Sequence, residues 1–158
     1  MNISSFSFPT TTLSGTGALG ELPARLAKLN IIRPLVVTDP GLLATEAFQK
    51  LQQTLGAAAQ GKTWFLHSGV HPNPIESDVH DSAAAYRAGQ CDAVIAFGGG
   101  SALDVGKAAR LLIKRPDLKL AEFRYEDDWS GLPPLIAIPT TAGTGSEVGR
   151  SSVVTITA

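Results

Sequence analysis

The stretch Asp92-Ala-Val-Ile-Ala-Phe-Gly-Gly-Gly-Ser-Ala-Leu-Asp-Val-Gly-Lys107 decides the fold of this 158-residue chain. Residues 93–97 are an apolar run rich in β-forming side chains, too short for a helix and followed by glycines, which predicts a buried strand. After the glycines, apolar side chains recur at helical spacing, at Val105, Ala108, Ala109 and Leu112. A strand, a glycine loop and a helix in this order are typical of phosphate sites, because glycine lets the backbone approach an anion that the helix N-terminus stabilises.

The glycine loop supplies the first candidate site residues, which are Gly99, Gly100, Ser101 and Asp104. Ser101 and Asp104 also fit a capping box, which predicts where the helix begins. The spacing excludes a P-loop, since Ala108 stands where the hydroxyl that binds magnesium would be. The Gly-x-Gly-x-x-Gly dinucleotide fingerprint, with its acidic residue roughly 20 positions later, is also absent. A tight strand-to-helix turn without any ligand remains the alternative.

Composition indicates a globular protein of one domain, since 158 residues with 44% hydrophobic side chains can bury a core. Lys and Arg total 13 against 14 Asp and Glu, without a basic run, which argues against nucleic acid or an anionic membrane as the main partner. Cys91 is the only cysteine, so an intrachain disulfide is excluded and a reducing compartment is favoured. We find neither a signal-peptide pattern nor an apolar stretch long enough to span a bilayer, and we expect a cytoplasmic protein.

Strand-like and helix-like segments alternate along the chain. Strands are predicted over residues 3–8, 35–38, 63–66, 93–97, 135–138 and 152–156. Helical stripes are predicted through Leu19, Leu22, Leu26 and Leu29, through Leu43, Ala47, Leu51 and Leu55, and over residues 76–88. The alternation predicts an α/β fold, a Rossmann-like open and mostly parallel sheet with helices on both faces. Because a terminal strand without a crossover helix leaves an apolar edge, we expect the chain to be the front part of something longer.

Asp39 follows the strand predicted over residues 35–38, at the place where ligands bind in open α/β sheets. A carboxylate there accepts hydrogen bonds from both hydroxyls of an adenosine ribose and repels a 2′-phosphate. This predicts NAD rather than NADP. The alternative is that Asp39 is only a turn residue or a helix cap before Pro40 and Gly41.

A second small-residue stretch, Pro139-Thr-Thr-Ala-Gly-Thr-Gly-Ser-Glu147, also follows a predicted strand. We expect it to lie at the same edge of the sheet as the glycine loop. Its hydroxyls, above all those of Thr140, Thr141 and Thr144, can donate to phosphate or ribose oxygens. A surface loop without a ligand is the alternative.

The histidines do not predict a metal site within this chain. His67 and His71 have a spacing that would align on a helix, but Gly69 and Pro72 exclude a helix there. Neither a carboxylate nor a cysteine is placed to complete a ligand set. Residues arranged for nucleophilic attack are likewise missing.

Two motifs resemble those of the iron-containing, or group III, alcohol dehydrogenases. They are Gly-Gly-Gly-Ser-x-x-Asp-x-x-Lys at residues 98–107 and Ala-Ile-Pro-Thr-Thr-Ala-Gly-Thr-Gly-Ser-Glu at residues 137–147. Residues 37–41 and 72–74 fall where similar segments fall in that family, so the resemblance spans nearly the whole chain. It implies that residues 1–158 form the dinucleotide-binding domain, with the fold of a dehydroquinate-synthase-like N-terminal domain.

The resemblance also implies roles for individual residues. Asp39 would bind the adenosine ribose. The pyrophosphate would be surrounded by Asn73, Gly99, Gly100 and Ser101. The path toward the nicotinamide would be lined by Thr140, Thr141 and Thr144.

By the same resemblance, the parent protein would be an NAD(P)-dependent oxidoreductase that interconverts a small alcohol and an aldehyde or ketone. A helical C-terminal domain, absent from this chain, would supply an aspartate and histidines to a divalent metal, iron or zinc, that polarises the substrate oxygen. Assembly into a homo-oligomer is compatible with the sequence. Two alternatives remain open: a non-catalytic nucleotide-binding or assembly module, and an enzyme similar to glycerol dehydrogenase or dehydroquinate synthase.

Overall fold

The computed structural model describes residues 10–57 and 63–156. Within them, a four-stranded sheet has the order β2-β1-β3-β4, and every neighbouring pair of strands is parallel. The strands are β1 (Pro34–Val37), β2 (Phe65–His67), β3 (Ala93–Gly98) and β4 (Leu135–Pro139). The strands predicted at these places are confirmed, and β2 begins and ends slightly later than expected. The strand predicted over residues 3–8 lies outside the described residues.

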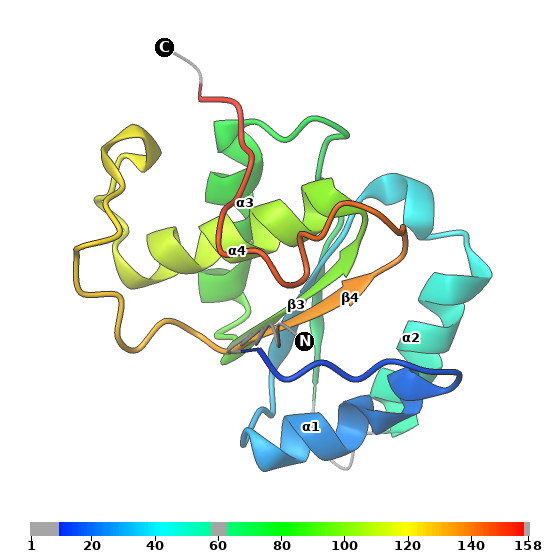
Figure 1. Ribbon diagram of the computed structural model, residues 1–158. Helices are drawn as coiled ribbons and strands as arrows, with labels where there is room; N and C mark the ends of the chain where they lie inside the picture. Colours follow the sequence, from blue (N-terminus) through cyan, green and yellow to red (C-terminus); the bar gives the residue numbers. More distant parts are fainter. Residues whose placement is uncertain (1–9, 58–62, 157–158) are drawn as a thin grey trace, which may run out of the picture.

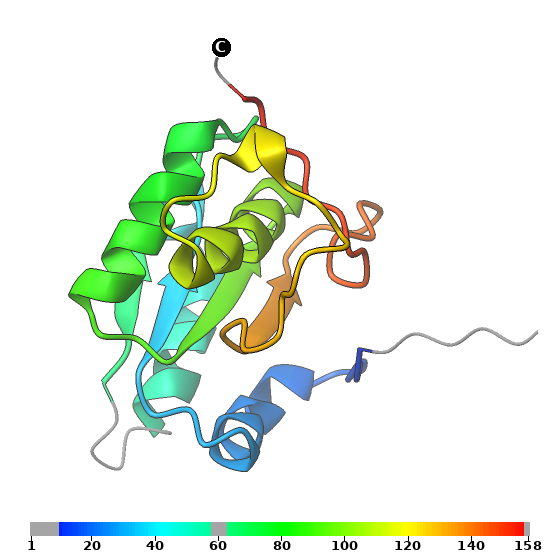
Figure 2. The same cartoon turned by 90° about the vertical axis from the view of Figure 1, so that its left-hand side faces the viewer.

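Helices cover both faces of the sheet, as predicted. They are α1 (Leu22–Lys28), α2 (Glu46–Ala57), α3 (Glu76–Ala88) and α4 (Gly100–Lys114), with short 3-10 turns at Ala18–Glu21, Pro40–Leu42 and Leu120–Glu122. Helices α1 and α2 lie on one face, and α3 and α4 on the other (Figure 1 and Figure 2). Within the described residues, we find no helix with the length and apolar character needed to cross a membrane.

Strand β3 is the centre of the core. All six of its residues are buried. Ile95 and Phe97 pack in the cluster formed with α1 and α2, whereas Val94 packs with Val105 of α4 on the opposite face. Because both faces are covered, the strand needs an apolar residue at every position, which explains the unbroken run in the sequence.

Helix α2 differs in phase from the predicted stripe. The hydroxyl of Thr45 accepts a hydrogen bond from the backbone N–H of Phe48 at 3.2 Å, so the helix begins at Glu46 rather than near Leu43. Phe48 then packs in the core together with Leu51 and Leu55, and the exposed Ala47 does not. The N-terminal stripe also ends early, since Leu29 lies beyond α1 and is 48% exposed.

The strand predicted over residues 152–156 is wrong. This segment makes one parallel bridge, between Thr155 and Ile75, and does not join the sheet. The Thr155 N–H donates to the Pro74 carbonyl at 2.8 Å, and the Glu76 N–H donates to the Thr155 carbonyl at 3.0 Å. Residues 152–156 are therefore extended, as their β-forming side chains favour, but they pair with the residues before α3 rather than with the sheet.

Candidate functional site

The carboxyl ends of the parallel strands meet at one edge of the sheet. Strand β1 has β2 on one side and β3 on the other, so the connections after β1 and β3 diverge at this point. Such a switch in strand order opens a crevice where open α/β sheets bind ligands. Figure 1 shows β3 and β4 pointing to this edge, with the segment after β4 returning across α4.

The glycine loop enters α4 through a conformation that favours glycine. Gly98 has φ +149°, and a Cβ there would lie 2.8 Å from the Cβ of Ala102. Gly99 is the residue before the helix, and no side chain caps the start of α4. The first N–H groups of the helix therefore keep their capacity to bind an anion.

The predicted capping box of Ser101 and Asp104 is wrong. The Ser101 hydroxyl donates to the carbonyl of Pro72, and the Asp104 carboxylate accepts hydrogen bonds from the segment after β4. Helix α4 begins at Gly100, one residue before Ser101, so neither side chain is in the register that a capping box needs.

The threonine-rich stretch lies directly on the glycine loop. A Cβ on Gly99 would lie 3.3 Å from the Thr141 hydroxyl oxygen, and one on Gly100 would lie 3.2 Å from the methyl carbon of Thr144. The Thr140 N–H also donates to the Gly98 carbonyl at 2.9 Å. The two loops therefore share one rim, as predicted, and a Cβ at Gly99 or Gly100 would crowd the threonine side chains.

Asp39 lies across the switch point from the glycine loop. A Cβ on Gly98 would lie 3.5 Å from one of its carboxylate oxygens, so the carboxylate is close to the loop. Asp39 precedes the 3-10 turn Pro40–Leu42 but makes no side-chain cap hydrogen bond. In the described residues we find no donor to this carboxylate, which leaves both oxygens available to a ligand.

Asn73 lies on a loop that the sequence did not show to be anchored. Asp78, which is 2% exposed, accepts hydrogen bonds from the backbone N–H of His71 at 3.3 Å and of Ile75 at 3.1 Å. It also bonds the imidazole Nδ1 of His71 at 2.7 Å. The signal that could have revealed this role is an acidic residue in the first turn of the helix after Pro74.

A cavity of about 340 Å³ lies between this loop, the start of α4 and the segment after β4. Its lining includes Asn73, Gly100, Ser101, Asp104 and Thr144. The volume falls in the range of small-molecule sites, about 300–1,000 Å³. Backbone donors at a helix start and small side chains can bind an anion there. The lining does not include four of the predicted site residues, which are Asp39, Gly99, Thr140 and Thr141.

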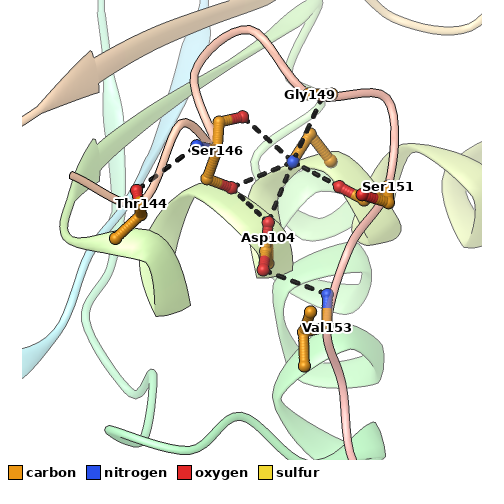
Figure 3. Close-up of polar contacts among 7 residues, drawn as sticks. Asp104, Thr144, Ser146, Gly149, Ser151 and Val153 are labelled. Atoms are coloured by element: carbon orange, nitrogen blue, oxygen red, sulfur yellow. Dashed lines mark hydrogen bonds and ion pairs between the residues drawn. The ribbon is translucent and has the colours of Figure 1, made fainter.

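Lys107 and Ser146 also belong to this site, and their roles were not predicted. Lys107 lies within α4, and its ammonium reaches the segment after β4 (Figure 3). Burial alone would raise the pKa of Asp104, but hydrogen bonds from Ser146 and Lys107 outweigh burial and lower it. The Val153 N–H and the charge of Lys107 act in the same direction.

The donor set does not fit a metal. In the part of the chain that the structure describes, we find no group of three or more His, Cys, Asp or Glu side chains that could hold an ion. Burial lowers the pKa of His67, and its Nε2 is buried without a hydrogen-bond partner among those residues. These side chains therefore do not make up a ligand set for a metal ion.

Comparison with known proteins identifies the family. The model of the family described as "Iron-containing alcohol dehydrogenase" matches residues 9–158. The chain belongs to the iron-containing alcohol dehydrogenase family. Alcohol dehydrogenase 4 of Schizosaccharomyces pombe is 36% identical over 157 residues, a match that covers 98% of this chain and 36% of that protein.

Solved structures of the family share the fold. The crystal structure of a 1,3-propanediol oxidoreductase matches with a TM-score of 0.88 and 33% identity, over 99% of this chain and 40% of that one. The sulfoacetaldehyde reductase of Bifidobacterium kashiwanohense, solved in complex with NAD⁺, matches with a TM-score of 0.77 and 30% identity, over 94% of this chain and 39% of that one. The chain thus spans 36–40% of the length of these three proteins.

Proposed function

We propose that residues 1–158 are the dinucleotide-binding domain of an NAD-dependent alcohol dehydrogenase. The observation that carries this proposal is the contact between the glycine loop, which lies at the switch point of the sheet, and the threonine-rich stretch after β4. Membership of the iron-containing alcohol dehydrogenase family supports it. The bound nicotinamide would accept or donate the hydride, and the residues of this chain would bind and orient the cofactor.

Every predicted site residue except Asp104 has a direct role in cofactor binding in this proposal. The open N-terminus of α4, at Gly99, Gly100 and Ser101, binds the pyrophosphate, with Asn73 on the facing loop. Asp39 accepts hydrogen bonds from the adenosine ribose, which favours NAD over NADP. The hydroxyls of the threonine-rich stretch follow the cofactor toward its nicotinamide; they are those of Thr140, Thr141 and Thr144.

The other half of the reaction is assigned to residues outside this sequence. Because the chain spans 36% of the Schizosaccharomyces pombe relative, we propose that the metal, iron or zinc, is held by a further domain. The substrate would be a small alcohol or the matching aldehyde or ketone. Cys91 is the only cysteine and is buried, which suits a reducing compartment, and we propose a cytoplasmic location.

Calorimetric titration of the chain with NAD tests the proposal. We expect one NAD to bind per chain, and the binding to persist in a metal chelator because the proposed contacts include no metal ligand. Gly100→Val should weaken binding at least about tenfold, since a Cβ at Gly100 already crowds Thr144 and a larger side chain fills the crevice.

Gly56→Val is the matched control, because Gly56 also lies in a helix but a Cβ there meets nothing within 4 Å. It should bind NAD as the unchanged chain does. A folded chain that binds no NAD contradicts the proposal, and equal binding by both variants contradicts the assigned place of the pyrophosphate.

A further inference from the structure

The segment of residues 144–153, here called the wall segment, is attached to the body of the molecule in an unusual way. It has no regular secondary structure, yet it forms one side of the cavity at the start of α4. Among the described residues, every hydrogen bond from the wall segment to another part of the chain goes to Asp104 or Lys107. Its remaining bonds, to Gly145 and Thr144, are internal.

Lys107 holds the segment by its backbone. Its ammonium donates to the carbonyl of Ser146 at 3.0 Å, to that of Gly149 at 3.4 Å and to that of Ser151. It also donates to the Ser146 hydroxyl at 3.0 Å. Figure 3 shows these acceptors gathered around one nitrogen. Because several backbone carbonyls bind the same cation, the backbone of the segment is held in one conformation. Hydrogen bonds from a charged donor hold it more strongly than those from a neutral side chain would.

Asp104 completes the arrangement one helical turn earlier. Its carboxylate lies 2.9 Å from the Lys107 ammonium, and both side chains are only 13% exposed. The same carboxylate accepts hydrogen bonds from the Ser146 hydroxyl and, at 3.0 Å, from the Val153 N–H. The carbonyl oxygens of the wall segment are thus bound by a positive charge, and one backbone N–H and one hydroxyl by a negative charge. Removing one partner of such a partly buried ion pair destabilises the folded chain, because the remaining charge is left without its partner.

The pair also determines where the wall segment lies relative to the glycine loop. Thr144, at the beginning of the segment, lies so close to Gly100, where α4 begins, that a Cβ on Gly100 would be 3.2 Å from the Thr144 methyl carbon. Ser146 follows within the same turn and is bound by both charged side chains. A displacement of Ser146 therefore moves Thr144 with respect to the open helix N-terminus.

We propose that Asp104 and Lys107 are positioning residues, which hold the wall segment against the start of α4 and so fix the width of the crevice that receives the diphosphate. This inference rests on the proposed NAD site, but the attachment of the wall segment can be measured without any ligand. Neither side chain needs to touch the cofactor for this role.

The test compares Lys107→Met with Lys114→Met. Both lysines lie on α4, but Lys114 makes no hydrogen bond or ion pair with the described residues. Arg150 is exposed within the wall segment and gives trypsin a cleavage site there. In the absence of NAD, Lys107→Met should accelerate cleavage after Arg150 about tenfold or more, since local opening loses charge-assisted bonds that oppose it. Lys114→Met should cleave at the unchanged rate.

The second measurement is ligand affinity by calorimetry and NMR titration. Lys107→Met should weaken NAD binding by about 10- to 100-fold, the equivalent of losing charge-assisted hydrogen bonds. Adenosine, which lacks the diphosphate, should bind within about twofold of its affinity for the unchanged chain. A general loss of fold would weaken both ligands alike. If Lys107→Met does not fold, Ser146→Ala removes one link to each charged side chain and should show the same pattern, weaker in size.

The outcomes separate the two proposals. Faster cleavage in Lys107→Met, in a chain that never binds NAD, supports the attachment and contradicts the proposed function. NAD binding by the unchanged chain, with unchanged affinity in Lys107→Met, overturns the positioning role. Cleavage at the same rate in both lysine variants overturns the attachment itself.

Discussion

Asp39 and Asp104 are carboxylates at the same edge of the sheet, but their surroundings give them different tasks. Asp104 is engaged by Lys107, Ser146 and the Val153 N–H, so its acceptor capacity is used within the chain. Asp39 lies beside Gly98 and accepts no hydrogen bond from the described residues. A polar group left in a crevice without partners is the one available for recognition, which makes Asp39 the residue to test for cofactor selectivity.

Asp39→Gly should reduce the preference for NAD over NADP by about 1–3 kcal/mol, because it removes charge-assisted hydrogen bonds to the ribose and the repulsion of a 2′-phosphate. Parallel calorimetric titrations with the two cofactors measure this difference. Asp128→Asn is the control, since it removes a negative charge from an exposed side chain that accepts a hydrogen bond from the nearby Ser130 N–H. Unchanged selectivity in Asp39→Gly would remove the role assigned to this carboxylate.

At the scale of elements, the close packing of α4 against β3 determines where the glycine loop lies. Gly106 faces Ala96 so closely that a Cβ on Gly106 would lie 2.7 Å from the Ala96 Cβ. The helix can therefore approach the strand only because one residue lacks a side chain. This approach sets the start of α4 above the end of β3.

Gly106→Ala should destabilise the chain by about 1–3 kcal/mol, because overpacking outweighs the better helix propensity of alanine. Gly56→Ala, in the open final turn of α2, should instead stabilise it by about 0.5–1 kcal/mol. Urea unfolding followed by circular dichroism gives both values.

The double variant Ala96→Gly with Gly106→Ala tests the cause. The Cβ that Gly106→Ala adds is then opposite the one that Ala96→Gly removes, so the double variant should be more stable than the sum of the single effects by about 1 kcal/mol. Strict additivity would show that the contact between α4 and β3 is not what limits the size of the residue at position 106.

At the scale of the whole molecule, the chain carries a formal net charge of -1, so individual charges rather than general repulsion set its response to acid. Asp104 is the partly buried carboxylate whose lowered pKa links folding to pH. A carboxylate with a lower pKa in the folded state stabilises that state above its unfolded pKa and loses this effect as the pH falls through the folded value.

Asp104→Asn should therefore lower the free energy of unfolding by about 1–3 kcal/mol near neutral pH. The difference from the unchanged chain should stay constant down to about pH 5 and shrink as the pH falls below about 4, the ordinary pKa of aspartate in an unfolded chain, toward the lowered pKa of folded Asp104. Urea unfolding at a series of pH values measures it. A difference that grows as the pH falls would contradict the sign of the pKa shift.

The sequence by itself determined the parallel α/β architecture and the edge of the sheet that carries the site. An apolar run such as residues 93–97, followed by glycines and a helical stripe, has few other ways to bury its side chains, and strands joined by helices place their carboxyl ends together. Local patterns also located the glycine loop, Asp39 and the threonine-rich stretch, because each directly follows a strand that the neighbouring residues predict.

Only the tertiary structure decided what the polar side chains bind. Asp104 satisfied the pattern of a capping box with Ser101, yet it bonds Ser146 and Val153, more than 40 positions away. Residues 152–156 had strand-forming side chains, yet they lie along the start of α3. Propensity and capping describe near neighbours in the chain, whereas the partner of a charge and the register of a last strand depend on which distant segments the packed core brings into reach.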